Sequence, residues 1–187
     1  TSASGKQPDA QTLAMIAKVK EAVDKLAPVE VPYVLNEEKV RIFQERMNAS
    51  TGLEKTKNAL SYGYELMLSG DIEKSIEVFS ETITELENAN FPGKAAFVFK
   101  IKKQLALGYL RKAELDNCIA NHNDESCILP ISEKAQHINK EGAQEAIFRL
   151  MGLLSENPND LECQYLLNIA NMVLGQYPDR VPEKFRI

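Results

Sequence analysis

The fold class follows from a stretch that begins Lys140-Glu141-Gly142-Ala143-Gln144-Glu145-Ala146-Ile147 and continues through Leu167-Asn168-Ile169-Ala170 to Gly175 and Tyr177. Ala146, Leu150 and Leu153 are spaced at i, i+4 and i+7, as on one apolar face of a helix. Pro158 ends this helix, because proline lacks the amide hydrogen that a helix interior needs. A second apolar stripe follows the turn and consists of Leu161, Leu167, Ala170 and Leu174. Two amphipathic helices joined by a short turn are therefore expected here.

The pattern resembles the tetratricopeptide repeat, a helix–turn–helix unit that stacks into a solenoid. Ala146, Leu150 and Pro158 match the second half of one repeat, and the Leu167-Asn168, Gly175 and Tyr177 spacing matches the first half of the next. A full repeat is expected upstream, from about residue 53 to residue 86, where Ala59-x-x-Tyr62-Gly63-x-x-Leu66 precedes a Gly70-Asp71 turn, Ser75 and Phe79. Small residues such as Gly63 let two helices approach closely.

The second repeat is expected to begin with Gln104-x-x-Leu107-Gly108, on a helix from about residue 92 to residue 115. Its partner helix begins only at Lys140, so residues 116–139 form an insertion much longer than the usual connection between paired helices. The resemblance implies an all-α, right-handed helical-repeat superhelix of about seven helices. Four parts are expected: a disordered N-terminus (1–9), N-terminal helices packing on the repeats (10–52), the repeats with their insertion (53–177), and a C-terminal linker or tail (178–187).

The composition is that of a folded protein without nucleic-acid or membrane-spanning features. Hydrophobic residues make up 44% of the chain and charged residues 26%, which favours a packed core over disorder. The net charge of −5 argues against a nucleic-acid partner, because such proteins carry basic patches. No apolar run approaches the roughly 20 residues of a membrane span.

Two of the three cysteines, Cys118 and Cys127, lie in the insertion. A long loop without its own core needs a tether, and a Cys118–Cys127 disulfide is the favoured one; it would imply an oxidising compartment. A metal site formed by Cys118, His122 and Cys127 is an alternative, although it lacks a CxxC pair and has few ligands. Two reduced, buried thiols are a third interpretation. Cys163 lies among apolar neighbours and is expected to be an inert core thiol.

No catalytic residue, metal ligand set or cofactor motif is predicted. His122 and His137 are the only histidines, and acidic pairs such as Asp124-Glu125 are typical of solvated loops. The sequence has no nucleophile elbow, phosphate-binding glycine loop or HExxH motif. A catalytic site on the insertion would require His122, Asp124 or Glu125 to converge with polar groups from elsewhere.

The last third of the chain resembles the helical segment that precedes the β-propeller in bacterial FG-GAP/ASPIC-UnbV proteins, relatives of cartilage acidic protein. The residues that carry the resemblance are Asn117-Cys118, Asn121-His122, Ser126-Cys127-Ile128-x-Pro130-Ile131, His137, Leu166-Leu167-Asn168-Ile169-Ala170 and Leu174-Gly175-x-Tyr177-Pro178-Asp179-x-Val181-Pro182. The resemblance implies a periplasmic or extracellular location, a modular non-catalytic role and a C-terminal β-propeller partner domain. No propeller sequence is present in this chain, so the propeller's calcium sites do not carry over.

The repeat pattern places nine residues of the first helices on a concave face: Leu60, Tyr64, Met67, Leu105, Tyr109, Lys112, Tyr165, Ile169 and Met172. An aromatic and aliphatic groove of this kind fits an apolar helix of a partner protein. The N-terminal helix from Leu13 to Leu26 is an alternative occupant of the groove, as is the insertion.

The predicted function is a non-catalytic protein–protein interaction scaffold of an exported protein, which binds a protein or peptide partner on this concave face. The alternative is an enzyme, or a small-molecule or carbohydrate-binding accessory module, with its site at the 116–139 insertion.

Overall fold

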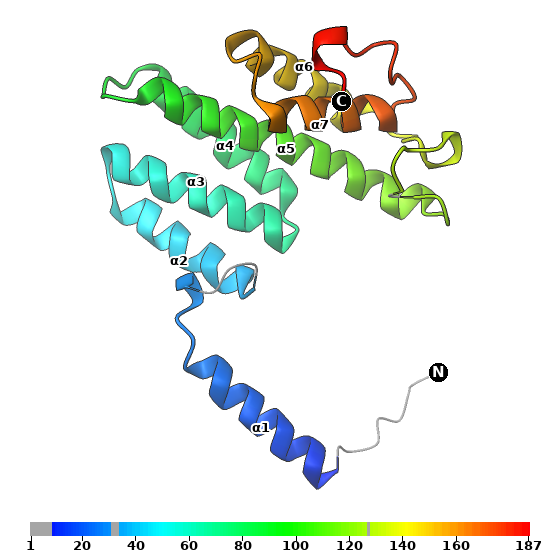
Figure 1. Cartoon of the computed structure of the whole chain (residues 1–187). Helices are drawn as coiled ribbons and strands as arrows, with labels where there is room; N and C mark the ends of the chain where they lie inside the picture. The colour runs from blue at the N-terminus through cyan, green and yellow to red at the C-terminus, as the bar shows by residue number, and fades with distance from the viewer. Residues whose placement is uncertain (1–8, 31–33, 127) are drawn as a thin grey trace.

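The chain folds into α-helices joined by turns, as a computed structural model shows (Figure 1). The structure describes residues 9–30, 34–126 and 128–187, and within these residues there are seven α-helices and no β-strand. The helices are α1 (Ala10–Asp24), α2 (Asn36–Ala49), α3 (Gly52–Ser69), α4 (Ile72–Glu87), α5 (Lys94–Asn121), α6 (Glu141–Glu156) and α7 (Leu161–Val173), with 3-10 turns η1 (Pro28–Glu30), η2 (Glu133–Ala135) and η3 (Glu183–Phe185). The predicted all-α class is confirmed. Within the described residues, no helix combines the length and the apolar character that a membrane crossing requires.

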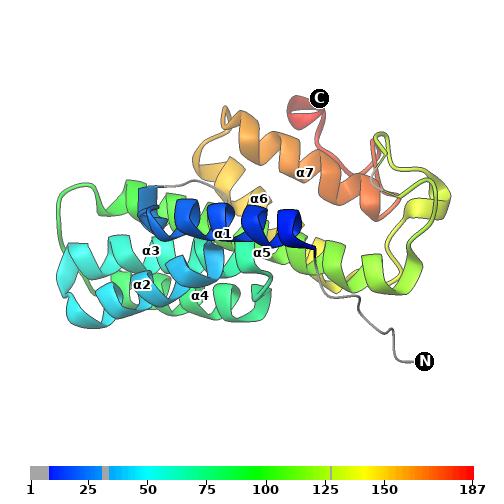
Figure 2. The same cartoon turned by 90° about the horizontal axis from the view of Figure 1, so that it is seen from below.

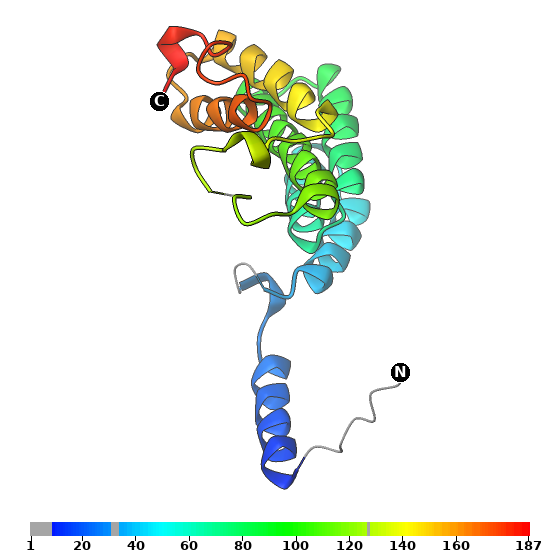
Figure 3. The same cartoon turned by 90° about the vertical axis from the view of Figure 1, so that its right-hand side faces the viewer.

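Helices α2 to α7 form a stack in which each helix packs on the next one along the chain (Figures 1 and 3). The long helix α5 lies between α4 and α6 and is the centre of this stack. Its inward residues Ile101, Ala106 and Ala113 are fully buried. Helix α7 packs mainly on α6 and only lightly on α5, so a trough remains between α5 and α7.

The α3–α4 pair is built around Gly63, as the sequence predicts. A Cβ atom on Gly63 would lie 2.4 Å from the ring of Phe79 on α4, so only glycine permits this approach. The Ser75 hydroxyl donates a hydrogen bond to the Gly63 carbonyl across the same contact, at 2.7 Å. Gly70, with a φ of 94°, ends α3, and the Asp71 side chain caps α4 by accepting from the amide of Lys74.

The α5–α6 pair departs from the prediction in two ways. Helix α5 continues to Asn121 instead of ending near residue 115, so the connection to α6 begins later than the predicted insertion. Gly108 faces Ile76 of α4 and not the partner helix α6, because a Cβ atom on Gly108 would lie 3.2 Å from the Ile76 side chain. The close approach to α6 is at Gly142, where a Cβ would lie 2.8 Å from the Tyr109 carbonyl oxygen and 2.9 Å from the Ala113 nitrogen.

Residues 178–187, for which a linker or tail is expected, fold back onto the helices. Val181 and Phe185 are buried in the same cluster as Leu150 and Leu167. The Asn168 side chain donates a hydrogen bond to the Phe185 carbonyl at 2.7 Å. The segment therefore covers apolar surface of α6 and α7 that would otherwise be open at the end of the stack.

The N-terminal part divides into a packed helix and a detached one. Val40, Phe43 and Met47 of α2 pack against the α3 cluster that contains Tyr62 and Leu66. Helix α1, capped by Asp9, has no buried residue and stands away from the stack in Figures 1 and 3; in Figure 2, seen from below, it lies in front of the other helices. Its packing thus differs from that expected for residues 10–52. Apart from Asp9, the N-terminus predicted to be disordered lies outside the described residues.

Candidate functional site

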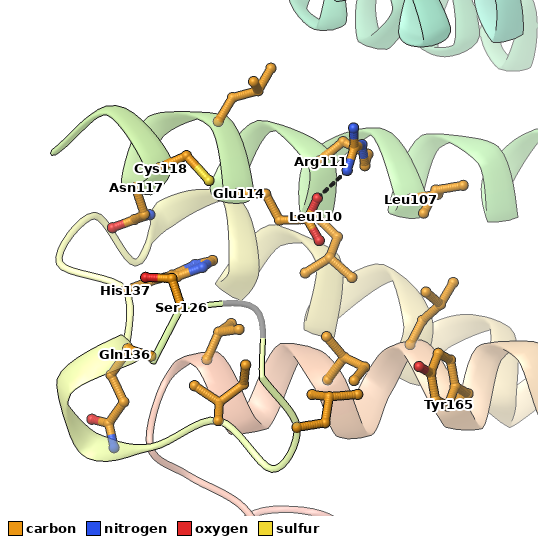
Figure 4. Close-up of a pocket in the computed structure, with 17 residues that line it drawn as sticks. Leu107, Leu110, Arg111, Glu114, Asn117, Cys118, Ser126, Gln136, His137 and Tyr165 are labelled. Atoms are coloured by element: carbon orange, nitrogen blue, oxygen red, sulfur yellow. Dashed lines mark hydrogen bonds and ion pairs between the residues drawn. The ribbon is translucent and has the colours of Figure 1, made fainter. Parts of the chain in front are cut away.

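The candidate site is a half-open cavity of about 440 Å³ between α5, α7 and the connection that follows α5 (Figure 4). We call it the α5/α7 pocket. Its lining is mainly apolar, and its volume is that of a typical small-ligand or side-chain pocket. The lining residues are Leu107, Leu110, Arg111, Glu114, Leu115, Asn117, Cys118, Ser126, Leu129, Ile131, Ala135, Gln136, His137, Tyr165, Leu166, Ile169 and Val173.

Two helical stripes form opposite walls of the pocket. On α5, Leu107, Arg111 and Cys118 are spaced so that they share one side of the helix. On α7, Tyr165, Ile169 and Val173 do the same at four-residue intervals. Tyr165 lies at one end of the pocket and His137 near the other (Figure 4). The pocket is therefore elongated along both helices and suits a rod-shaped apolar ligand.

Lys103 fixes the separation between the two walls. Its ammonium group lies 2.8 Å from the carboxylate of Asp160, the N-cap of α7, and 2.9 Å from that of Glu162. Although burial lowers the pKa of Lys103, the hydrogen bonds to both carboxylates raise it above its usual value. A cation held in this way ties the N-terminus of α7 to the middle of α5.

Asn117 is the tether of the third wall, the connection after α5. This buried residue accepts hydrogen bonds from the amides of Ile138 and Asn139, at 2.7 and 2.9 Å, and donates to the Asn139 carbonyl at 2.8 Å. The His137 amide donates in turn to the Val173 carbonyl of α7 at 2.8 Å. One asparagine and one backbone bond thus hold residues 137–139 against both helices.

The polar groups of the pocket are few. Arg111 and Glu114 form an ion pair on the α5 wall, drawn as a dashed line in Figure 4. Burial lowers the pKa of His137, so its imidazole is neutral at pH 7. The buried Nδ1 atom of His137 makes no hydrogen bond within the described part of the chain. A bound molecule with one hydrogen-bonding group would supply the missing hydrogen-bond partner of this nitrogen atom.

The residues considered for catalysis on the insertion do not converge at this pocket. His122 and Asp124 are exposed, Glu125 pairs with Lys134 at 2.6 Å, and none of them lines the cavity. In the described ranges, no group of three or more His, Cys, Asp or Glu side chains is placed to hold a metal ion.

Of the three cysteines, Cys118 and Cys163 lie among the described residues. Cys127 lies outside them, so both the Cys118–Cys127 disulfide and the Cys118, His122 and Cys127 metal site remain predictions; the described ranges contain no disulfide. Cys163 is fully buried, as expected, and burial raises the pKa of its thiol to about 12. A thiol in that state is inert toward oxidants and electrophiles at neutral pH.

Only two of the nine predicted partner-binding residues, Tyr165 and Ile169, line the pocket. Leu60, Met67 and Leu105 belong to the core between helices. Tyr64 and Met172 are half-buried outside the pocket.

The other two, Tyr109 and Lys112, point away from the pocket. The Arg149 guanidinium stacks 4.0 Å from the Tyr109 ring centre, and Lys112 pairs with Glu73 at 3.2 Å. Tyr109 therefore packs against Arg149 of α6 and does not line the pocket with Tyr165.

On α5, the predicted concave face and the pocket wall differ by a shift of two residues. The wall contains Leu107, Arg111 and Glu114, each two positions beyond the predicted Leu105, Tyr109 and Lys112. Two residues turn an α-helix by about 200°, which moves the predicted face to the opposite side. The sequence signal that could have located the wall is the spacing of Leu107, Arg111, Leu115 and Cys118, which recur at intervals of three and four residues.

No protein-family model matches the chain, and comparison with curated proteins and with solved structures gives no significant match.

Proposed function

We propose that the chain is a non-catalytic protein-interaction module that binds an apolar helical segment of a partner protein in the α5/α7 pocket. The observation that carries the proposal is the half-open apolar pocket of about 440 Å³ between two helices, with Tyr165 half-exposed at one end. Helix-in-groove recognition uses apolar anchors spaced by one turn, and the two walls of the pocket have this spacing.

The repeat interpretation is part of the proposal. The stacked helices α3 to α7 would be right-handed tetratricopeptide-like repeats, with the short α3–α4 turn and the long α5–α6 connection as two variants of one unit. In such repeats the first helices of successive pairs face the ligand, and the pocket lies between two of them, α5 and α7.

The cellular setting is proposed from the sequence resemblance. The chain would act outside the cytoplasm, with Cys118 and Cys127 paired, and would adjoin a β-propeller domain. A disulfide at this position is consistent with an oxidising compartment.

The test uses a display library of short amphipathic helical peptides, selected against the full chain. Tyr165→Glu should weaken the selected peptides at least about tenfold, or 1.4 kcal/mol, because a charge replaces an aromatic wall. Leu161→Glu is the matched control, since Leu161 lies on the same helix, is 73% exposed and does not line the pocket. Equal affinities for the two variants would contradict the proposal.

A small apolar molecule is the second candidate ligand, favoured by the unsatisfied Nδ1 atom of His137. Phenol and hexanol are suitable probes, because each has an apolar body and one hydrogen-bonding group. His137→Phe should abolish their thermal stabilisation of the chain, because it removes the nitrogen that would bond them. Loss of peptide binding in His137→Phe, with no probe effect on the original chain, would favour the protein partner alone.

A further inference from the structure

The α5/α7 pocket is long and narrow. Its α5 wall extends from Leu107 to Cys118, about 17 Å along the helix axis, and its α7 wall from Tyr165 to Val173, about 12 Å. A cavity of about 440 Å³ spread over about 17 Å has a mean cross-section of about 26 Å², whereas an α-helix about 10 Å across has one of about 80 Å². A helix can therefore insert only its side chains, while a single hydrocarbon chain can enter whole.

The pocket has an apolar body between two distinct ends. Tyr165, which is half-exposed, lies at one end, and His137 lies near the other (Figure 4). Between them the lining residues that α7 supplies are all aliphatic, namely Leu166, Ile169 and Val173. A ligand that matches this lining has an apolar chain and keeps its polar group at an end.

His137 supplies the unsatisfied polar atom of the lining. Among the described residues that line the pocket, only its Nδ1 atom is buried without a hydrogen bond. The ring is half-buried and its rotation about the Cβ–Cγ bond is soft, so Nδ1 can turn toward a ligand. A neutral imidazole has one donor and one acceptor nitrogen, and a hydroxyl group can both donate and accept. A hydroxyl therefore satisfies Nδ1 in either tautomer.

The charges of the lining disfavour an ionised group at the His137 end. Arg111 and Glu114 are the charged residues of the described lining, and they pair with each other on the α5 wall. His137 is neutral, so the described lining has no unpaired charge to offer a carboxylate or an ammonium group. An ionised group would lose its water there without gaining a partner, which is costly. A neutral polar group is therefore favoured.

We propose that the α5/α7 pocket binds a linear lipid with a neutral hydroxyl head, which is hydrogen-bonded to His137 while the hydrocarbon chain extends toward Tyr165. The inference rests on the proposed function, since it names a ligand class for the same site and makes that ligand a competitor of the partner helix. Carbon–carbon bonds of about 1.5 Å advance an extended chain by about 1.3 Å per carbon, so walls of about 12 to 17 Å match roughly 9 to 13 carbons.

The first experiment measures the affinity of the full chain for straight-chain alcohols from hexanol to decanol, by calorimetric titration below their solubility limits. Each added methylene should tighten binding about fourfold, because each buries a similar apolar area. Decanoate, which is ionised at pH 7, should bind at least about tenfold more weakly than decanol. Adamantanol, which has as many carbons as decanol but in a compact cage, should also bind more weakly, because the pocket is narrow.

The second experiment locates the hydroxyl head. His137→Phe keeps an aromatic ring and removes the nitrogen, so it should weaken decanol binding about tenfold. His122→Phe is the matched control and should bind decanol as the original chain does, because His122 is exposed and does not line the pocket. Nitrogen NMR spectra of the original chain give a readout that does not depend on a variant's folding. The Nδ1 resonance of His137 should shift when decanol binds, and the resonances of His122 should not.

Three outcomes overturn the inference. They are an affinity that does not change with chain length, equal affinities for decanol and decanoate, and decanol binding that leaves the His137 Nδ1 resonance unchanged. Failure of the proposed function gives a different result. Peptide binding that depends on Tyr165, without alcohol binding, would remove the lipid and leave the proposed protein interaction standing. Decanol binding by a chain that selects no peptide would support the lipid and contradict the partner helix.

Discussion

The helix pairs α3–α4 and α5–α6 both approach closely at a glycine, but different residues form the two contacts. In the first pair the close approach is made by Gly63 of the leading helix, against Phe79 of the following one. In the second pair it is made by Gly142 of the following helix, against the backbone of Tyr109 and Ala113. The glycine that permits close packing thus lies on the leading helix in the first pair and on the following helix in the second.

The connections of the two pairs differ as well. Gly70 and Asp71 close the first pair in a tight turn, whereas residues 122–140 join α5 to α6 and supply a wall of the α5/α7 pocket. The comparison teaches that the α5/α7 pocket arises at the irregular pair. A regular pair buries its apolar surface between its own helices and leaves little for a ligand.

The largest effects should come from filling the two close approaches. Gly63→Leu and Gly142→Leu should each destabilise the fold by about 3 kcal/mol, because core overpacking typically costs 1–3 kcal/mol and both sites lack room even for a Cβ. Gly108→Ala is the control and should cost less than about 1 kcal/mol, since the added Cβ would meet only a side-chain atom at 3.2 Å. Urea unfolding measures all three. If Gly108→Ala were as unstable as Gly142→Leu, Gly108 would be a close helix contact, in the position that Gly63 has in the first pair.

Periodicity predicted the helices and the first pair well. Gly63, Ser75 and Phe79 occupy the expected contact, because in a short pair one glycine and one aromatic residue leave a single way to pack. In the 28-residue helix α5, small residues occur at Ala106, Gly108 and Ala113, so sequence alone could not decide which of them faces α6.

The ends of the chain were harder to predict. Two prolines near the C-terminus indicated a tail, yet Val181 and Phe185 are buried in the core although the segment forms no α-helix. At the N-terminus the apolar face of α1 was predicted, but its occupancy of the groove in the same chain was not found. Periodicity shows that a face is apolar and does not show what covers it.

The next effect concerns the connection of the second pair. If Cys118 and Cys127 are bonded, the disulfide closes a short loop and contributes roughly 2–3 kcal/mol by restricting the unfolded chain. Dithiothreitol should then lower the unfolding midpoint, and thiol titration of denatured, unreduced protein should give one reactive cysteine, Cys163. Three reactive thiols would show that no such bond forms. The connection between α5 and α6 would then be held less firmly than the tight turn of the first pair.

Asn117 offers a non-covalent comparison with that bond. Asn117→Ala leaves the amides of Ile138 and Asn139 without their acceptor and should destabilise the fold by about 2 kcal/mol. Asn117→Asp keeps the acceptor oxygens and should protect these two amides in hydrogen exchange better than Asn117→Ala does. If these two amides exchange at the same rate in both variants, the side chain of Asn117 does not hold the connection between α5 and α6.

The smallest effects distinguish the ion pairs at the two ends of the stack. In the Lys39–Glu65 pair, between α2 and α3, the charged atoms lie 3.7 Å apart, and burial raises the pKa of Glu65 although Lys39 opposes the shift. In the Lys103–Asp160 pair, between α5 and α7, burial alone would raise the pKa of Asp160. Hydrogen bonds from Lys103 and from the Cys163 amide outweigh burial and lower it. The two carboxyl groups are therefore shifted in opposite directions.

Opposite shifts predict opposite dependences of stability on pH. The contribution of Asp160 is present above its ordinary pKa of 3.8 and is lost as the pH falls through its lower folded value. The contribution of Glu65 is present below its ordinary pKa of 4.5 and is lost as the pH rises through its higher folded value. Relative to the original chain, Asp160→Asn should therefore become less stable as the pH rises from 2 to 7, and Glu65→Gln more stable. The opposite signs of the two trends are the prediction, since both pairs are largely shielded from water. Urea unfolding at several pH values measures them, and parallel trends in the two variants would mean that the ends of the stack do not differ in this way.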